Sequence, residues 1–249
     1  MVGFFSVNNK LTSLNIHDGI APSGYDSNLL GSYIEEIIKY YRYVELRALA
    51  CQTLSPPYAD ALRQRSEYIF SREEGQREET AVDVVLRQAT SSSQERLLIE
   101  IESLILFASI LLDRIAAFTE QFLGRSAEHP WRSFSSFKYL KEYAEKHGYE
   151  VPTEPFIQSI EWLMKNLKEF RHLYIAHKHE GDSRPRYGVN VSVNIHTGEA
   201  SFGIGSVLYP TASDESVCTS LTMKELTDGI HNFMDMWVDY ISDNASTKL

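Results

Sequence analysis

The chain is poor in cysteine, with only Cys51 and Cys218 among its 249 residues. Structural zinc sites need several Cys and His residues at short spacings, and disulfide-stabilised domains need several cysteine pairs. Two isolated cysteines, far apart in the sequence, exclude both classes of protein. The pattern is typical of a reducing compartment and predicts a cytoplasmic protein.

Long hydrophobic runs are also missing. The most apolar stretch, residues 104–112, is far shorter than the roughly 20 residues that a membrane-spanning helix needs, and charged residues flank it. The N-terminal residues Met1-Val2-Gly3-Phe4-Phe5-Ser6 lack the basic region and apolar run of a signal peptide. We therefore expect neither export nor a membrane partner, and we interpret residues 104–112 as part of a buried helix.

Positive charge is scarce as well. The chain has 24 Lys and Arg residues against 34 Asp and Glu residues, which gives a formal net charge of -10. Non-specific nucleic-acid binding depends on cations that neutralise phosphates, so a broad nucleic-acid-binding surface is excluded. Any nucleic-acid site must be local.

What is present is the composition of an ordinary globular protein, 43% hydrophobic and 23% charged. A chain of this length can bury one substantial core, and no linker-like segment divides it. We predict a single domain over residues 1–249. Its expected parts are an irregular or strand-containing arm (1–26), a helical core (27–180), a β-hairpin (about 186–207) and a final helix (222–243).

Apolar residues recur every three or four positions over most of the core, which predicts amphipathic helices. The expected helices cover about 27–54, 57–70, 72–90, 94–123 and 133–147. The first should end before Pro56-Pro57, since proline has no N–H to donate within a helix. The Ser91-Ser92-Ser93 cluster should cap the fourth helix.

After about residue 186 the period changes from helical to strand-like. Tyr187, Val189, Val191, Val193 and Ile195 alternate with polar or small residues, and a second alternation follows the turn-like pair Thr197-Gly198. This pattern predicts the β-hairpin. Downstream, the spacing of Thr222 and Glu225 is that of a capping box, which should open the last helix.

The clearest candidate for chemistry is Arg171-His172-Leu173-Tyr174-Ile175-Ala176-His177, which ends an amphipathic segment. The apolar stripe of that segment steps by three or four residues through Phe156, Ile160, Leu163, Leu167, Phe170 and Tyr174. Arginine binds phosphate through a planar, permanently charged fork, and histidine can move a proton near neutral pH. Arg171 and His177 lie roughly 60° to either side of Tyr174 and about 9 Å apart along the axis, so one helix alone makes a wide site.

The heptapeptide from Arg171 to His177 resembles the Arg, four to six residues, His signature of the HEPN superfamily (higher eukaryotes and prokaryotes nucleotide-binding), in which a polar residue often follows the Arg. His172 takes that polar place, and the helix containing Leu111-Leu112-Asp113-Arg114 looks like the core partner of the signature helix. The resemblance covers roughly residues 27–180 and the final helix. It implies a mainly α, HEPN-like antiparallel helical bundle, into which the hairpin at 186–207 is inserted.

The resemblance also implies a metal-independent endoribonuclease that works as a homodimer and needs no cofactor. His177 would act as general base or acid, Arg171 would stabilise the charge on the phosphoryl oxygens, and His172 would orient the phosphate. Such a hydrolase would serve as a toxin or in antiviral and stress defence, with an antitoxin or other regulatory protein as partner. The expected RNA-binding residues are Lys168, Lys178, His179 and Arg184.

Local charge agrees with a nucleic-acid site. Between positions 165 and 186 the sequence has six basic residues and only three acidic ones. The basic residues are Lys165, Lys168, Arg171, Lys178, Arg184 and Arg186, and the acidic ones are Glu169, Glu180 and Asp182. A dimer would double this basic segment in one place, which would attract RNA. Cations near a helix C-terminus also complement the helix dipole, which is the structural alternative.

Each candidate has a structural interpretation too. Arg171 could pair with Asp113 or Glu169, and His177 could pack under the hairpin. Lys178 and His179 could simply be solvated at the helix end. Two other functions therefore stay open: a non-catalytic HEPN-like module that binds nucleotide, RNA or protein, and an unrelated helical interaction module in which Arg171 and His177 stabilise a dimer.

Overall fold

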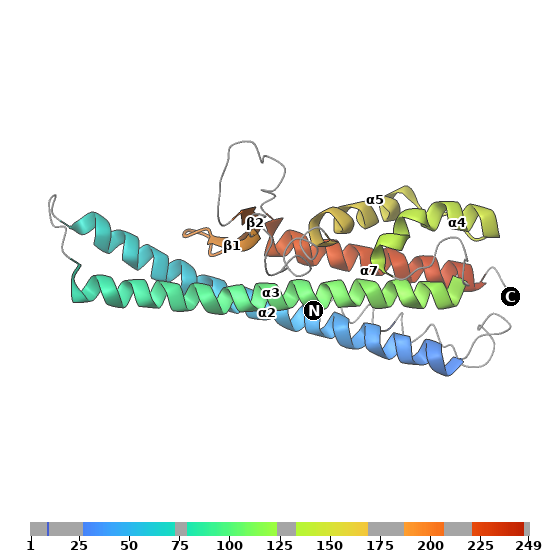
Figure 1. Ribbon diagram of the computed structural model, residues 1–249, viewed down its shortest axis with the longest axis horizontal. Coiled ribbons are helices and arrows are strands. Elements are labelled where there is room, and N and C mark those ends of the chain that lie inside the picture. Colours follow the sequence, from blue (N-terminus) through green and yellow to red (C-terminus); the bar gives the residue numbers. More distant parts are fainter. Residues whose placement is uncertain are drawn as a thin grey trace, which may run out of the picture. The chain divides into compact units, whose positions relative to one another are not determined.

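The structure, a computed structural model, describes residue 9 and residues 27–72, 79–123, 133–168, 187–206 and 221–246. The described part is mainly helical with one small antiparallel sheet, which confirms the predicted fold class (Figure 1). The chain divides into two compact units. Unit 1 comprises Met1–Glu45, Ile105–Ile175 and Thr227–Leu249, and unit 2 comprises Leu46–Leu104 and Ala176–Leu226.

Helix α2 (Ser27–Ser71) passes through Pro56 and Pro57, so the predicted end before these prolines is wrong. Two hydroxyls bond to carbonyls in the turn before the prolines: Ser55 Oγ donates to Cys51 O at 2.6 Å, and Thr53 Oγ1 donates to Leu49 O at 2.8 Å. Cys51, Tyr58 and Ala59 are buried on either side of the prolines. Packing of the flanking turns therefore outweighs the local cost of proline.

Helix α3 (Ala81–Leu123) likewise passes through Ser91-Ser92-Ser93, which do not cap a helix as predicted. Within this stretch Thr90 Oγ1 donates to the carbonyl of Leu86 at 2.8 Å, a bond that is compatible with a continuous helix. The helix predicted from residue 72 begins instead after Thr80, whose side chain caps the first turn. One helix therefore replaces the two that the sequence predicted.

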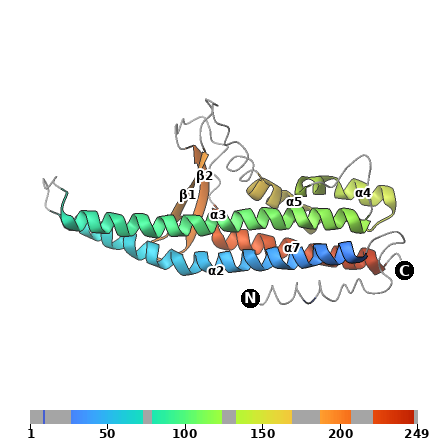
Figure 2. The ribbon, with the colours of Figure 1, turned by 60° about the horizontal axis from the view of Figure 1, so that its bottom comes forward.

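The core of unit 1 forms where α7 (Met223–Ser246) packs on the second half of α3, beside which it lies in both views (Figures 1 and 2). Trp237 is fully buried, and its Nε1 donates to Thr119 Oγ1 at 3.0 Å. Phe233 makes edge-to-face contacts with Phe134 and Phe137. The predicted final helix is thereby confirmed, and Phe233 and Trp237 lie on its buried face. Asn244, one residue beyond the predicted end at 243, is also buried, accepting from Glu150 N and donating to Tyr240 O.

The remaining helices of unit 1 are shorter. The predicted helix at 133–147 consists of a 3-10 turn, η1 (Phe134–Tyr139), followed by α4 (Leu140–His147), which ends at Gly148 with a left-handed φ of 71°. Helix α5 (Glu154–Leu163) continues into a π-helical turn, η2 (Met164–Lys168). Close packing joins α5 to α7, because a Cβ built on Gly229 would lie 2.3 Å from Cζ3 of Trp162.

In unit 2 the sheet has the order β1-β2-β3 and is antiparallel, with β1 (Tyr187–Val193), β2 (Ala200–Ser206) and β3 (Leu221–Thr222). The predicted hairpin is confirmed, and Gly198 supplies the positive φ of 72° in its turn. The predicted capping box is also present: Thr222 N donates to Glu225 Oε2 at 2.8 Å, and Glu225 N donates to Thr222 Oγ1 at 3.1 Å. The predicted arm over residues 1–26 lies, apart from Asn9, outside the described residues.

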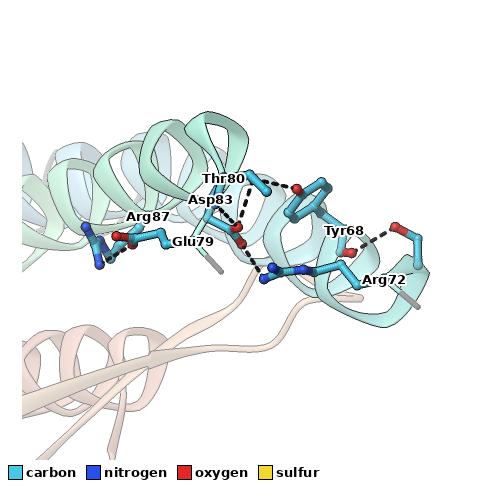
Figure 3. A network of polar contacts seen from close by, with 7 residues as sticks. Tyr68, Arg72, Glu79, Thr80, Asp83 and Arg87 are labelled. Carbon is cyan, nitrogen blue, oxygen red and sulfur yellow. Dashed lines mark hydrogen bonds and ion pairs between the residues drawn. The ribbon is translucent and has the colours of Figure 1, made fainter. Parts of the chain in front are cut away.

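A polar network ties the end of α2 to the start of α3 in unit 2 (Figure 3). Tyr68 Oη lies 2.7 Å from Thr80 Oγ1, and Arg72 Nη1 donates to Asp83 Oδ1 at 3.1 Å. The other carboxylate oxygen of Asp83 accepts from both the backbone N–H and the hydroxyl of Thr80, each at 2.8 Å. These reciprocal bonds form a capping box that fixes where α3 begins.

We expect this network to weaken in acid. Hydrogen bonds from the backbone and side chain of Thr80, with the Arg72 and Arg87 cations adding, hold the pKa of Asp83 below its ordinary value. A lowered folded-state pKa gives stability that is present above the unfolded-state pKa and is lost as pH falls through the folded-state pKa. The midpoint of thermal unfolding of Asp83→Asn should therefore lie below that of the wild type at neutral pH and approach it in acid. Glu79→Gln, which alters only the exposed pair with Arg87, is the matched control. A difference in unfolding midpoint between Asp83→Asn and the wild type that stays constant with pH would contradict the stabilising role of the Asp83 carboxylate.

Candidate functional site

The predicted catalytic residues Arg171, His172 and His177 lie outside the described residues. The same holds for the predicted RNA-binding residues Lys178, His179 and Arg184, and the described part of their segment ends at Lys168. The structure therefore neither brings these residues together nor separates them. Their proposed roles stay predictions.

The segment that leads to the signature has the predicted character. Phe156, Ile160, Leu163 and Leu167 are all buried, so the inner face follows the spacing read from the sequence. The helix changes from α to π geometry at Met164. Short π-helical turns often occur at functional sites, because they re-aim the side chains that follow.

A small hollow of about 60 Å³ opens in unit 1 beside this segment. The described part of its lining comes from three places in the sequence: α3, the start of η1, and η2. The lining residues are Ser109, Leu112, Asp113, Ser133, Phe134, Ser135 and Leu167. Leu167 precedes Arg171 by four positions in the sequence. The hollow is therefore lined by a residue that lies close in sequence to the predicted catalytic residues.

Hydrogen bonds hold the polar side chains of the hollow in place. Asp113 Oδ1 accepts from the backbone N–H of Phe134 at 3.2 Å. The hydroxyl of Ser109 is buried and donates to the carbonyl of Ile105 at 2.8 Å. Ser133 Oγ and Ser135 Oγ lie 2.7 Å apart. The described lining thus combines the Asp113 carboxylate with three hydroxyls and with the apolar side chains of Leu112, Phe134 and Leu167.

A second polar cluster in unit 1 was not anticipated from the sequence. His231 on α7 contacts Tyr41 Oη through Nδ1, and its Nε2 lies 2.8 Å from Glu45 Oε1, an ion-pair contact rather than an in-line hydrogen bond. Burial, with the carboxylates of Glu45 and Asp235 adding, raises the pKa of the Tyr41 phenol above its ordinary value. Tyr41 is only 1% exposed. A protonated phenol that solvent cannot reach suits a structural link between α2 and α7 better than a catalytic group.

The only sequence signal for this cluster was weak. Tyr41 and Glu45 are four residues apart and so share one face of a helix, and His231 directly follows the apolar Ile230 in the predicted final helix. A histidine at such a position gives no indication of its partners.

The described residues give little support for a metal site, a reactive thiol or a membrane span. Among them, no three His, Cys, Asp or Glu side chains gather closely enough to hold a metal ion. Burial raises the pKa of the Cys51 thiol to about 12, which suits an inert core thiol. None of the described helices combines the length and apolar character that a membrane span requires.

Comparison of the chain with protein-family models, with curated proteins and with solved structures finds no significant match. The resemblance to the HEPN superfamily accordingly rests on the signature itself and on the order of helices, and it stays a prediction.

Proposed function

We propose that this protein is a metal-independent endoribonuclease of HEPN type, active as a homodimer in the cytoplasm. The observation that carries the proposal is the sequence Arg171-His172-x4-His177 at the end of a segment whose spacing predicts an amphipathic helix. The mainly helical fold and the buried stripe from Phe156 to Leu167 support it, since the signature of this superfamily lies late in a helical bundle. RNA would be the substrate.

The chemistry follows from the two residue types. His177 takes the proton of a ribose 2′-hydroxyl, and the resulting oxygen attacks the adjacent phosphorus. The bond to the 5′-oxygen of the next nucleotide breaks, that oxygen receives a proton, and a 2′,3′-cyclic phosphate remains. Arg171 stabilises the charge that grows on the phosphoryl oxygens, and His172 orients the phosphate. The 2′-hydroxyl nucleophile restricts cleavage to RNA.

In a homodimer two signatures would face each other across a two-fold axis, which would shorten the distance between cations and phosphate. Lys168, Lys178, His179 and Arg184 would add local positive charge along the RNA in an otherwise acidic protein. Uncontrolled RNA cleavage is harmful to a cell, so the proposal includes a toxin or antiviral defence role and an antitoxin or other regulatory partner.

The test is incubation of the purified protein with mixed cellular RNA in EDTA, with DNA as the matched substrate control. We expect RNA fragments and intact DNA, because the reaction needs the 2′-hydroxyl and no metal. RNA that stays intact in EDTA would sink the proposal, whether or not added Mg²⁺ restores cleavage. Light scattering of the same sample at micromolar concentration should give a dimer, and a monomer would count against a composite cleft.

One observation favours the alternative of a non-catalytic protein-interaction module. In unit 2, residues 81–96 of α3 contain a single buried residue, Thr90, while Val85 is 62% exposed and Phe70 near the end of α2 is 87% exposed. Exposed large apolar side chains on two helices are typical of contact surfaces. With this function the protein would leave RNA intact. Phe70→Ser, rather than His177→Ala, would then abolish binding of the protein partner.

A further inference from the structure

Three aromatic rings gather where α2 and α3 meet in unit 1. Tyr40 and Tyr43 lie one turn apart on α2, with ring centroids 6.0 Å apart and ring planes at 84°. The ring of Phe107 on α3 lies 5.0 Å from that of Tyr43 and 6.4 Å from that of Tyr40. All three residues are half-buried, so part of each is open to solvent. We call these three rings the aromatic platform.

Contacts on both sides hold the platform in place. Tyr41 is 1% exposed and contacts His231 of α7, which anchors the neighbouring face of α2 in the core. One turn before Tyr40, the ion pair of Arg114 Nε with Glu36 Oε2 at 3.1 Å joins α2 to α3. The rings therefore stand on two helices that are fixed to each other at this point. A rigid surface of this kind loses little entropy when a ligand binds.

Two cations lie beside the rings. Lys39 Nζ lies 5.7 Å from the Tyr40 centroid and 5.9 Å from the Tyr43 centroid, at the outer limit of a cation–π contact. Arg42 follows Lys39 by three positions and is its neighbour on the helix surface, and both residues are exposed. In the sequence these residues alternate as Lys39-Tyr40-Tyr41-Arg42-Tyr43. Positive charge and aromatic surface are thus combined within two turns of α2.

Single-stranded nucleic acid carries the matching groups. Each nucleotide has a base with a flat π-face and a phosphate with a negative charge. Proteins bind such strands by stacking the bases on aromatic side chains and by placing cations along the backbone. Half-buried rings supply the first kind of contact, and the long, exposed side chains of Lys39 and Arg42 supply the second.

We propose that the aromatic platform stacks bases of single-stranded nucleic acid while Lys39 and Arg42 bind its phosphates, an inference that rests on the proposed ribonuclease function. In the cell the strand would be the RNA substrate. Stacking needs only the face of a base, so the platform holds RNA of many sequences rather than selecting one. The platform binds the strand and takes no part in the cleavage step.

A protein segment is the competing occupant of an aromatic surface. Proline-rich peptides dock on aromatic side chains in several recognition domains. Such a peptide has no regularly spaced negative charges, so it leaves the exposed cations Lys39 and Arg42 without a role. A polyanion uses the rings and the cations together, which is why the contacts favour nucleic acid.

The test measures binding of the full chain to a fluorescein-labelled oligothymidine DNA of about ten nucleotides by fluorescence anisotropy in EDTA. DNA lacks the 2′-hydroxyl, so the proposed nuclease leaves this probe intact. An abasic strand of the same length keeps the phosphates and lacks the bases. We expect the abasic strand to bind at least about tenfold more weakly, the effect of losing one stacking contact.

Substitutions separate the rings from the cations. Tyr43→Ala should weaken oligothymidine binding about tenfold and leave abasic binding unchanged, whereas Tyr43→Phe, which keeps the ring, should bind as the wild type does. Lys39→Gln and Arg42→Gln should each lower the slope of log Kd against log salt concentration by about one. Lys138 lies 4.6 Å from the Tyr139 centroid elsewhere in unit 1, so Lys138→Gln and Tyr139→Ala are the matched controls and should change neither value. If Tyr43→Ala unfolds, the salt slopes and the abasic strand still decide.

The outcomes separate this inference from the proposed function. Equal binding of the two strands, no oligothymidine binding at ~10⁻⁴ M protein, or salt slopes unchanged in Lys39→Gln and Arg42→Gln overturns the platform, whatever the protein does to RNA. Binding of a proline-rich peptide in place of oligothymidine overturns it too. RNA cleavage whose KM is unchanged in a folded Tyr43→Ala variant removes the platform and leaves the nuclease intact. Base-dependent binding by a protein that does not cleave RNA keeps the platform and removes the nuclease.

Discussion

Replacing Gly229 with valine should lower the free energy of unfolding by about 3 kcal/mol, because overpacking in a well-packed region costs about 1–3 kcal/mol and valine adds two further methyl groups. A Cβ at this position would lie 2.3, 2.8 and 2.9 Å from three carbons of the Trp162 ring. The ring packs directly on the backbone of α7 at this point, so α5 or α7 must shift. Denaturant unfolding measures the loss.

Gly31 provides the matched control, since it is also a helical glycine in unit 1. A Cβ at Gly31 would meet no atom within 4 Å. Gly31→Ala should therefore raise stability by about 0.5–1 kcal/mol through helix propensity, whereas Gly229→Ala should lower it despite the same gain. In a Trp162→Leu background the loss from Gly229→Ala should shrink. Equal effects of the two alanine substitutions would contradict the close packing of α5 on α7.

Replacing His177 or Arg171 with alanine should slow RNA cleavage by about 10²–10⁴-fold each, since general acid–base catalysis and stabilisation of phosphoryl charge each contribute on that order. The loss should appear in the cleavage rate, measured with a defined RNA under single-turnover conditions. The two effects should be less than additive, because both residues act in one chemical step.

Exposed residues elsewhere supply controls of the same type. His196 lies exposed in the hairpin turn, and Arg63 forms an exposed pair with Asp60 on α2. His196→Ala and Arg63→Ala should leave the cleavage rate unchanged. Cleavage that survives His177→Ala would remove its assigned role while leaving the activity in place, and an equal loss in His196→Ala would point to general destabilisation.

Structural features formed by residues close together in the sequence could be predicted. The hairpin turn at Gly198 and the capping box of Thr222 and Glu225 each involve a few consecutive positions, and both are present. The predicted helix end before Pro56 and Pro57 is wrong, because burial of Cys51 and Tyr58 decides whether the helix continues, and the local sequence does not reveal that burial. Local rules predict local bonds, whereas continuity of a long helix depends on what packs against it.

The polar clusters could not be predicted from local rules, because their residues lie far apart in the sequence. Tyr41 and His231 are 190 positions apart, and Asp113 meets Phe134 across 21 positions. No periodicity links such residues, so the sequence indicates neither the cluster of Tyr41, Glu45 and His231 nor the lining of the hollow. For Asp113 the sequence suggests an ion pair with Arg171, not the bond to Phe134 N–H. Its neighbours Ser133 and Ser135 gave no signal at all.

The most direct measurement for the nuclease is the chemistry of the RNA ends left by the wild-type protein in EDTA. We predict a 2′,3′-cyclic phosphate on one fragment and a 5′-hydroxyl on the next, with both ends lost in His177→Ala. A 3′-hydroxyl with a 5′-phosphate, or cleavage that stops when EDTA is added, would contradict the account.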